Sequence, residues 1–332
     1  MPKIIYHGIY ADYIEQFVSF KRSLGYKYLD EEKIFAKFDR FTIESGESTI
    51  GISKELSDKW FARMGCESDS YRYSRCSCIN QLASYLCNIK IRSHINKLPK
   101  YRCAFVPYVY SKKEMENIFM ACDELVSKEK KMDSTIFSMP ILIRLLYGTG
   151  LRINEALGLR NKDFDLTDNY IVVRDNKNGL ERKVPLSDSL AMACRTYLEY
   201  RDQLPINTSD DSFFFVKLNG ERCNRYTSSI RRWFRKVLTK SGIVFTGDSH
   251  NHCGPRIHDI RHTTACHALA QMVDEGMDLY CSLPIISTFL GHQSLKATDL
   301  YVRLTAEMYP GLLKNADILC LNVFPRLDYE AY

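Results

Sequence analysis

The chain has 332 residues, 45% of them hydrophobic, which is enough for two globular domains with sizeable cores. Its formal net charge of +6 is mildly basic and by itself says little about partners. No apolar run approaches the ~18 residues that span a bilayer, and the first seven residues lack the apolar segment of a signal peptide. These features argue against a membrane protein and a disulfide-stabilised secreted protein. We therefore expect a cytoplasmic protein whose twelve cysteines are free thiols.

The first hundred residues are predicted to form four short amphipathic helices. Apolar residues recur at helical spacing until Gly25 ends the first pattern. Ser53 is typical of an N-cap for a third helix ending near Met64, and residues 70–89 form the fourth. The stripes expected to form a core are Tyr13, Phe17, Phe20 and Leu24, then Ile34, Phe35, Phe38 and Phe41, then Ile79, Leu82 and Leu86. This pattern indicates a four-helix bundle.

Between Ser70 and Lys113 the sequence contains no Asp or Glu. A stretch with one sign of charge repels itself unless an anion compensates it. Neutralisation of phosphates by Lys and Arg drives DNA binding, so we interpret this stretch as a DNA contact. The alternative is a solvated face beside a linker. The residues expected to contact DNA are Arg72, Arg75, Lys90, Arg92, Lys97, Lys100 and Arg102.

The boundary between two domains is predicted within a basic segment. Residues 93–110 contain Pro99 and Pro107 and show little periodicity, which is typical of a linker. Ser111 and Glu114 then have the spacing of a capping box, which marks the beginning of a helix. We therefore expect a helical domain with its basic linker over residues 1–105 and a second domain over residues 106–332.

The second domain mixes helices with a small sheet. An apolar helix from Met139 ends at a glycine-rich turn, residues 148–150. Residues 170–173 and 182–186 are predicted strands around a polar turn that contains Asn178-Gly179, a strong hairpin signal. Further helices are predicted over residues 187–200, 226–239, 259–276 and 283–290. The expected fold class is α+β, mainly helical with a small antiparallel sheet.

Six residues of this domain have the chemistry needed to break a phosphodiester without a metal. The charge on the phosphate oxygens must be neutralised, the nucleophile must lose a proton and the leaving oxygen must gain one. Guanidinium groups fit two phosphate oxygens, imidazoles titrate near neutral pH, and a tyrosine hydroxyl can attack phosphorus. In chain order the set is Arg152, Lys177, His258, Arg261, His292 and Tyr301.

In type, order and spacing these positions resemble the tyrosine recombinases, also called the phage integrase family. The motifs that carry the resemblance are Gly148-Thr149-Gly150-Leu151-Arg152, His258-Asp259-Ile260-Arg261-His262, Leu290-Gly291-His292 and Thr298-Asp299-Leu300-Tyr301. The resemblance implies that Tyr301 forms a 3′-phosphotyrosyl link and releases a 5′ hydroxyl, with no metal or cofactor. It also implies that Lys177 protonates the leaving oxygen and that Glu155 orients the arginine or a histidine. Lys183 is the alternative lysine, and His262 is not counted as catalytic.

The resemblance extends to the partners of the chain. The family acts on double-stranded DNA as a tetramer, in some cases with accessory recombination proteins. Its N-terminal helical domain, called the core-binding or SAM-like domain, closes a C-shaped clamp around DNA. The segments around Asp278 and Arg303 resemble integrases carried by transposons of Gram-positive bacteria. We therefore expect an enzyme that integrates or excises a mobile element.

Several alternatives stay open at this point. A chromosome-dimer resolvase or a type IB topoisomerase would use the same residues for another task. A DNA-binding regulator with an inactive recombinase fold would not need all six positions filled. Tyr280 and Tyr309 are the nearby rivals of Tyr301 among 21 tyrosines. A metal cluster built on His250, His252 and Cys253 lacks the paired ligand spacings of structural zinc sites, so we expect no metal.

Overall fold

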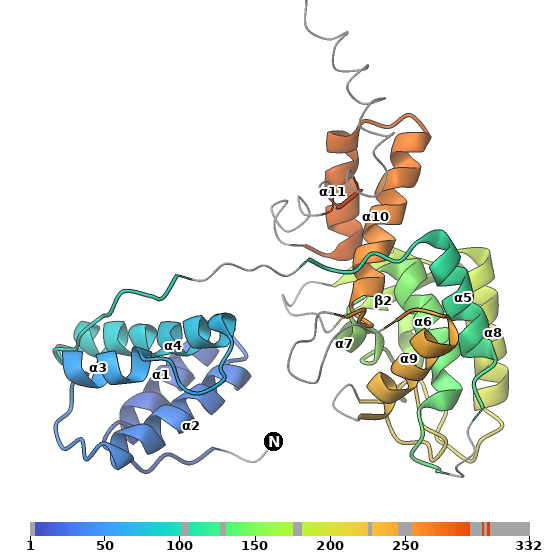
Figure 1. Cartoon of the computed structure of the whole chain (residues 1–332). Helices are drawn as coiled ribbons and strands as arrows, with labels where there is room; N and C mark the ends of the chain where they lie inside the picture. Colours follow the sequence, from blue (N-terminus) through green and yellow to red (C-terminus); the bar gives the residue numbers. More distant parts are fainter. Residues whose placement is uncertain are drawn as a thin grey trace, which may run out of the picture. The chain divides into compact units, whose positions relative to one another are not determined.

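The chain divides into two compact units, Met1–Phe105 and Val106–Tyr332, in a computed structural model (Figure 1). The residues that the structure describes are 4–100, 106–126, 131–174, 181–224, 228–244, 254–292, 301 and 304–305. No helix within these ranges combines the length and apolar character that crossing a membrane requires.

The first unit is a bundle of four helices, α1 Ala11–Ser23, α2 Leu29–Glu44, α3 Lys54–Phe61 and α4 Asp69–Asn88. Aromatic side chains dominate its core, with the rings of Phe17 and Phe35 packed edge to face at 5.8 Å. The prediction that Phe20 and Leu24 belong to this core is wrong, because their exposed fractions are 48% and 57%. The buried stripe of α1 instead continues from Ile14 and Phe17 through Val18.

Serine caps fix where two helices of the first unit begin. The hydroxyl of Ser53 accepts the Leu56 amide at 3.0 Å, which confirms the predicted start of α3. The hydroxyl of Ser68 likewise accepts the Tyr71 amide at 3.2 Å, one residue before α4 begins. Helix α3 ends at Phe61, earlier than the predicted Met64.

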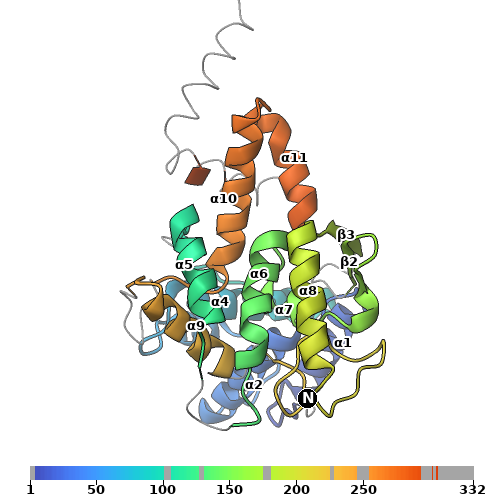
Figure 2. The ribbon, with the colours of Figure 1, turned by 90° about the vertical axis from the view of Figure 1, so that its right-hand side faces the viewer.

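The second unit is mostly helical with a three-stranded antiparallel sheet in the order β1-β2-β3, which confirms the predicted fold class. Helix α6 packs against five other α-helices of this unit (Figure 2). Its side chains Ile143 and Leu145 are fully buried. The elements are α5 Lys112–Asp123, η1 Ile136–Ser138, α6 Met139–Thr149, α7 Ile153–Ala156, η2 Asn161–Asp163, β1 Phe164–Asp165, β2 Tyr170–Val173, β3 Arg182–Pro185, α8 Asp188–Arg201, α9 Ser228–Lys240, α10 Asp259–Asp274 and α11 Leu279–Leu290.

Local signals located most of these elements correctly. The Ser111 hydroxyl accepts the Glu114 amide at 3.2 Å and the Glu114 carboxylate accepts the Ser111 amide at 2.7 Å, so the capping box is confirmed. Both predicted strands form, with Ile171 opposite Val184. Helix α7 and strand β1 were not predicted, because four and two residues are too few to show a periodicity.

Gly150 ends α6 in a conformation that brings the site together. Its φ of +59° is left-handed, and a Cβ at this position would lie 2.6 Å from Leu290 Cδ2 at the end of α11. Its carbonyl accepts a hydrogen bond from Arg261 of α10 at 2.6 Å. A glycine is therefore required both by the backbone angle and by the space, and the chain can turn directly to Arg152.

Replacing Gly150 with alanine should destabilise the second unit by about 2–4 kcal/mol, from left-handed strain and from overpacking against Leu290. Gly242→Ala is the matched control, because its φ is +76° and a Cβ there would have no described atom within 4 Å. The chain has two tryptophans, so Trp233 fluorescence in a Trp60→Phe background follows urea unfolding of the second unit alone. An equal decrease in the free energy of unfolding for both variants would contradict this account.

Candidate functional site

Two arginines converge where α6, α7, α10 and α11 meet. Arg261 is buried in the first turn of α10 and donates to the carbonyls of Gly150 at 2.6 Å and Leu290 at 2.7 Å. Arg152 lies at the beginning of α7, and its Nη1 donates to Glu155 Oε1 at 2.7 Å. Glu155 Oε2 lies 4.0 Å from Arg261 Nη1, so the buried carboxylate connects the two guanidinium groups.

A third guanidinium, to which the sequence motifs assigned no role, belongs to the same cluster. Arg182 begins β3, and its Nη2 donates to Glu155 Oε2 at 2.9 Å. The feature of the sequence that could have identified Arg182 is its position directly after Glu181, next to the turn expected to carry the lysine. That lysine, Lys177, lies outside the described residues, and Lys183 is exposed with its Nζ 4.2 Å from the Tyr170 ring centre.

Tyr301 is buried beside two histidine rings. Its ring centre is 5.9 Å from that of His292, with the planes nearly parallel, and 5.6 Å from that of His262. His262 in turn packs edge to face against His258 at 5.3 Å. The structure therefore brings together five of the six predicted catalytic residues, Arg152, Arg261, His258, His292 and Tyr301. His262, which was not counted as catalytic, lies among them.

Burial controls the protonation of the nucleophile candidate. The positive charges of Arg261 and Arg152 lower the pKa of Tyr301 and so favour its phenolate. Burial instead raises the pKa of Tyr301 above its ordinary value of 10.0, and the opposing effect of a hydrogen bond and positive charge from Arg261 is smaller. The hydroxyl is therefore protonated at neutral pH and needs a proton acceptor when it reacts.

The histidines of the site are neutral at physiological pH. Burial, followed by neighbouring positive charges, lowers the pKa of His262 to about 3 and that of His292 to about 4. The same causes lower the pKa of His258, although its side chain is more exposed. Burial beside Arg152 lowers the pKa of Arg261 to about 10, which still leaves it charged. Three cations against one carboxylate give an excess of positive charge that suits a phosphodiester.

The lowered histidine pKa values predict that the second unit loses stability in acid. The unfolded chain takes up protons below the ordinary histidine pKa of 6.5, whereas His262 and His292 resist protonation until about 3 and 4. The stability that these two neutral histidines allow is complete above pH 6.5. It falls as the pH falls, by up to about 2 kcal/mol for each histidine between pH 7.5 and 5. Urea midpoints followed by Trp233 at both pH values measure the loss, and His262→Gln should reduce it. A wild-type midpoint that does not change with pH would refute this prediction.

The two arginines expected to contact DNA from α4 have structural partners. The prediction for Arg75 is wrong, because its buried guanidinium binds both oxygens of Glu67 at 2.7 and 2.6 Å and donates to the carbonyls of Trp60 and Ala62. Arg72 donates to the Phe61 carbonyl at 3.0 and 2.8 Å. Both side chains satisfy carbonyls that the end of α3 leaves without partners. Lys90, Arg92, Lys97 and Lys100 are exposed, and Arg102 lies outside the described residues.

Replacing Arg75 with methionine should destabilise the first unit by about 3–5 kcal/mol, because Glu67 would stay buried without its cation. Arg63→Met is the matched control, because Arg63 and Asp69 form an ion pair in which both side chains are more than half exposed, a type worth at most about 1 kcal/mol. Trp60 fluorescence in a Trp233→Phe background reports unfolding of this unit. Similar losses for both variants would show that Arg75 is not a structural residue.

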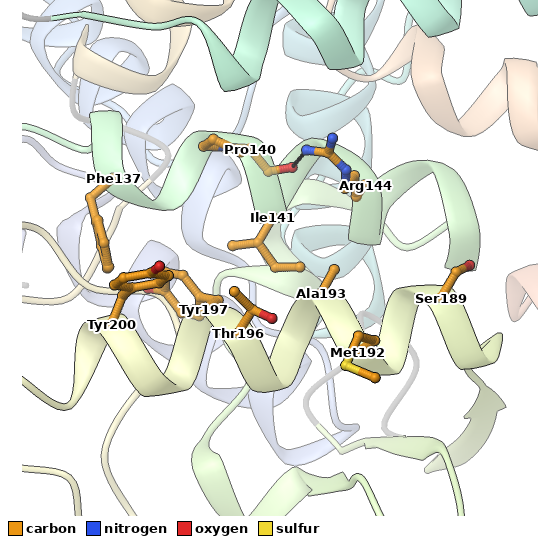
Figure 3. Close-up of a pocket in the computed structure, with 10 residues that line it drawn as sticks. All are labelled: Phe137, Pro140, Ile141, Arg144, Ser189, Met192, Ala193, Thr196, Tyr197 and Tyr200. Carbon is orange, nitrogen blue, oxygen red and sulfur yellow. Dashed lines mark hydrogen bonds between the residues drawn. The ribbon is translucent and has the colours of Figure 1, made fainter.

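A groove of about 420 Å³ lies between α6 and α8, and none of its lining residues belongs to the site. Figure 3 shows Ile141 and Ala193 between the two helices, with Tyr197 and Tyr200 at one end. Its charged group, Arg144, already binds both carboxylate oxygens of Asp123 at 2.8 and 2.6 Å. The groove therefore offers apolar surface rather than reactive groups. Within the described residues no three His, Cys, Asp or Glu side chains are placed to hold a metal; His250, His252 and Cys253 lie outside them.

Known proteins resemble this chain over all the residues that form the site in the second unit. The model of the phage integrase family matches residues 109–308. A putative integrase/recombinase y4rB of Sinorhizobium fredii is 28% identical over 298 residues, which are 89% of this chain and 93% of that protein. Tyrosine recombinase XerA of Pyrococcus furiosus is 28% identical over 197 residues, 59% of this chain and 58% of that protein. The solved structure of the Tn1549 transposon integrase with transposon right end DNA shares the fold, at 17% identity and a TM-score of 0.60 over 89% of this chain and 98% of that one.

Proposed function

Because this chain belongs to the phage integrase family, we propose that its second unit cuts and rejoins double-stranded DNA by attack of Tyr301 on a phosphodiester. The observation that carries the proposal is the convergence on Tyr301 of Arg261, His292 and, through Glu155, Arg152. These groups supply a nucleophile, a hydrogen-bond donor and two guanidinium groups in one buried place. They are the parts that a metal-free phosphoryl transfer needs.

The proposed reaction uses this arrangement together with Lys177, whose role the family resemblance supplies. Arg152 and Arg261 bind the non-bridging oxygens and neutralise the charge that grows as the bond forms. The Tyr301 hydroxyl attacks phosphorus, its proton passes to a neutral histidine, and the 3′-phosphotyrosyl bond replaces the bond to the 5′ oxygen. The leaving oxygen takes a proton from Lys177. A 5′ hydroxyl of a partner duplex then attacks the phosphotyrosine, so the bond energy is conserved and no nucleotide is consumed.

The remaining parts of the proposal concern partners and task. We place the first unit as the core-binding domain, with Lys90, Arg92, Lys97 and Lys100 against phosphates because all four are exposed. Strand exchange between two sites requires a tetramer on DNA, in some systems with accessory proteins. The likeness of the second unit's fold to a transposon integrase supports use by a mobile element. The second candidate task is chromosome-dimer resolution, supported by the likeness to a XerA recombinase.

A random pool of nicked suicide duplexes tests this function. Wild-type protein should form adducts that survive denaturation, and sequencing the attached DNA should give a shared motif. Two copies of that motif placed on one plasmid should then recombine, and a single copy should not. Relaxation of supercoils without a motif would indicate a topoisomerase, and DNA binding without any adduct would indicate a regulator.

A further inference from the structure

We propose that Arg182 is a positioning residue for DNA cleavage, which holds Glu155 and the turn that carries His292 in one fixed arrangement. This inference rests on the proposed function and deepens it. The family resemblance assigned no role to this arginine. Two contacts of the side chain, together with its charge and burial, support this role.

The first contact is with Glu155. Glu155 Oε1 accepts from Arg152, whereas Oε2 accepts from Arg182 at 2.9 Å and from the Arg152 amide at 3.0 Å. Arg261 is farther from the same oxygen, at 4.0 Å. Arg182 is thus the only guanidinium among the described residues whose side chain directly holds Oε2 at hydrogen-bonding distance. Without Arg182, Oε2 keeps only the Arg152 amide as a hydrogen-bond donor, so the carboxylate and the Arg152 side chain bound to it are held less firmly.

The second contact is with Gly291. The φ of Gly291 is +67°, and a Cβ there would lie 2.8, 2.9 and 3.0 Å from Nη1, Cζ and Nε of Arg182. Three nearly equal distances place the flat face of the guanidinium against this residue. Backbone bonds from Gly291 to Thr288 at 3.0 Å and from His292 to Ser287 at 2.9 Å close the turn. The position before His292 therefore has no room for a side chain while Arg182 is in place.

The third feature is the charge of Arg182 and the burial of its donors. The side chain is 13% exposed, and its Nε and Nη1 are buried without a hydrogen-bond partner in the part of the chain that the structure describes. Burying a charged side chain with unpaired donors costs free energy that a neutral side chain would avoid. We therefore assign a role to the charge of Arg182. Burial is the largest cause of the lowered pKa of His292, and the positive charges of Arg261, Arg152 and then Arg182 lower it further, against Glu155. Arg182 thus helps to keep the imidazole neutral. A neutral His292 stacks on Tyr301 without adding a repelling charge beside Arg261.

Two readouts test the role of Arg182. The first is the single-turnover rate of adduct formation on the random pool of nicked suicide duplexes, measured at saturating DNA. Arg182→Met should lower this rate by about 10–100-fold, the range typical of groups that orient reactive residues, with little change in DNA affinity. The second is the pKa of His292, followed by NMR of the imidazole in the free protein, which should rise in the same variant. Arg182→Lys keeps the charge, so it should keep the low pKa but restore the rate only in part.

The controls separate this role from general damage. Arg174→Met removes an arginine bound to Asp163 at 2.9 Å and to Glu181 at 3.4 Å, beyond the end of β2, and should change neither readout. Gly291→Ala should reproduce the rate loss with Arg182 intact, and it provides a second variant should Arg182→Met fail to fold. Wild-type rate and wild-type pKa in Arg182→Met would overturn the inference. Absence of adducts from wild-type protein would refute the proposed function instead, and the NMR readout would still test the effect of Arg182 on the pKa of His292.

Discussion

Replacing Tyr301 with phenylalanine is expected to abolish covalent attachment to DNA while the protein keeps its fold. The ring is 2% exposed and packs in an apolar cluster with Leu269, Leu290 and Leu304, and phenylalanine fills the same space. The hydroxyl contributes a hydrogen bond with Arg261 and the attacking oxygen. Without it, adduct formation should fall by more than about 10³-fold, since loss of a nucleophile cannot be replaced by binding energy.

The measurement is adduct yield on the suicide duplex pool, with non-covalent binding of the same pool as a check on folding. Tyr280→Phe and Tyr309→Phe are the matched controls, because these are the nearest other tyrosines in the sequence. Both controls should form adducts at the wild-type rate. Adducts that persist in Tyr301→Phe would identify another nucleophile.

Replacing Arg261 with lysine should lower the cleavage rate by at least about 10²–10³-fold. The Arg261 fork reaches the carbonyls of Gly150 and Leu290 at once and still has donors left for a phosphate. The single ammonium of lysine keeps the charge but cannot make these contacts together. The α6 and α11 ends would then separate, and Tyr301 would lose its hydrogen-bond partner.

Arg144→Lys is the control for Arg261→Lys. Arg144 also binds two oxygen atoms in a planar fork, those of Asp123, but it lies in the groove between α6 and α8. Its replacement should leave the cleavage rate within about twofold of wild type, as expected for a partly exposed surface pair. If both lysine variants lose activity equally, the effect of Arg261→Lys reflects the helix framework and not the reaction.

The sequence contained the local signals of this fold and of the predicted site. The capping box at Ser111, the glycine at 150 and the spacing from His258 to Arg261 act over a few residues, so they are visible in the linear chain. The properties that the sequence did not reveal depend on contacts that exist only in the folded chain. Arg75 and Arg182 have the same side chain as a DNA-binding arginine, and only the fold brings Glu67 and Glu155 to them. The raised pKa of Tyr301 likewise follows from burial, which the arginine spacing did not reveal.

The identity of the residue that carries the DNA tests the central claim most directly. The three candidate tyrosines fall in different tryptic peptides, and the peptide of residues 297–303, Ala-Thr-Asp-Leu-Tyr-Val-Arg, contains Tyr301 alone. Adducts formed in the presence of a chelator should be digested with nuclease and trypsin and examined by mass spectrometry. Our account predicts a nucleotide attached through its 3′ phosphate to this peptide and to no other. A nucleotide on the peptides of Tyr280 or Tyr309, or adducts that form only when a divalent metal is present, would contradict it.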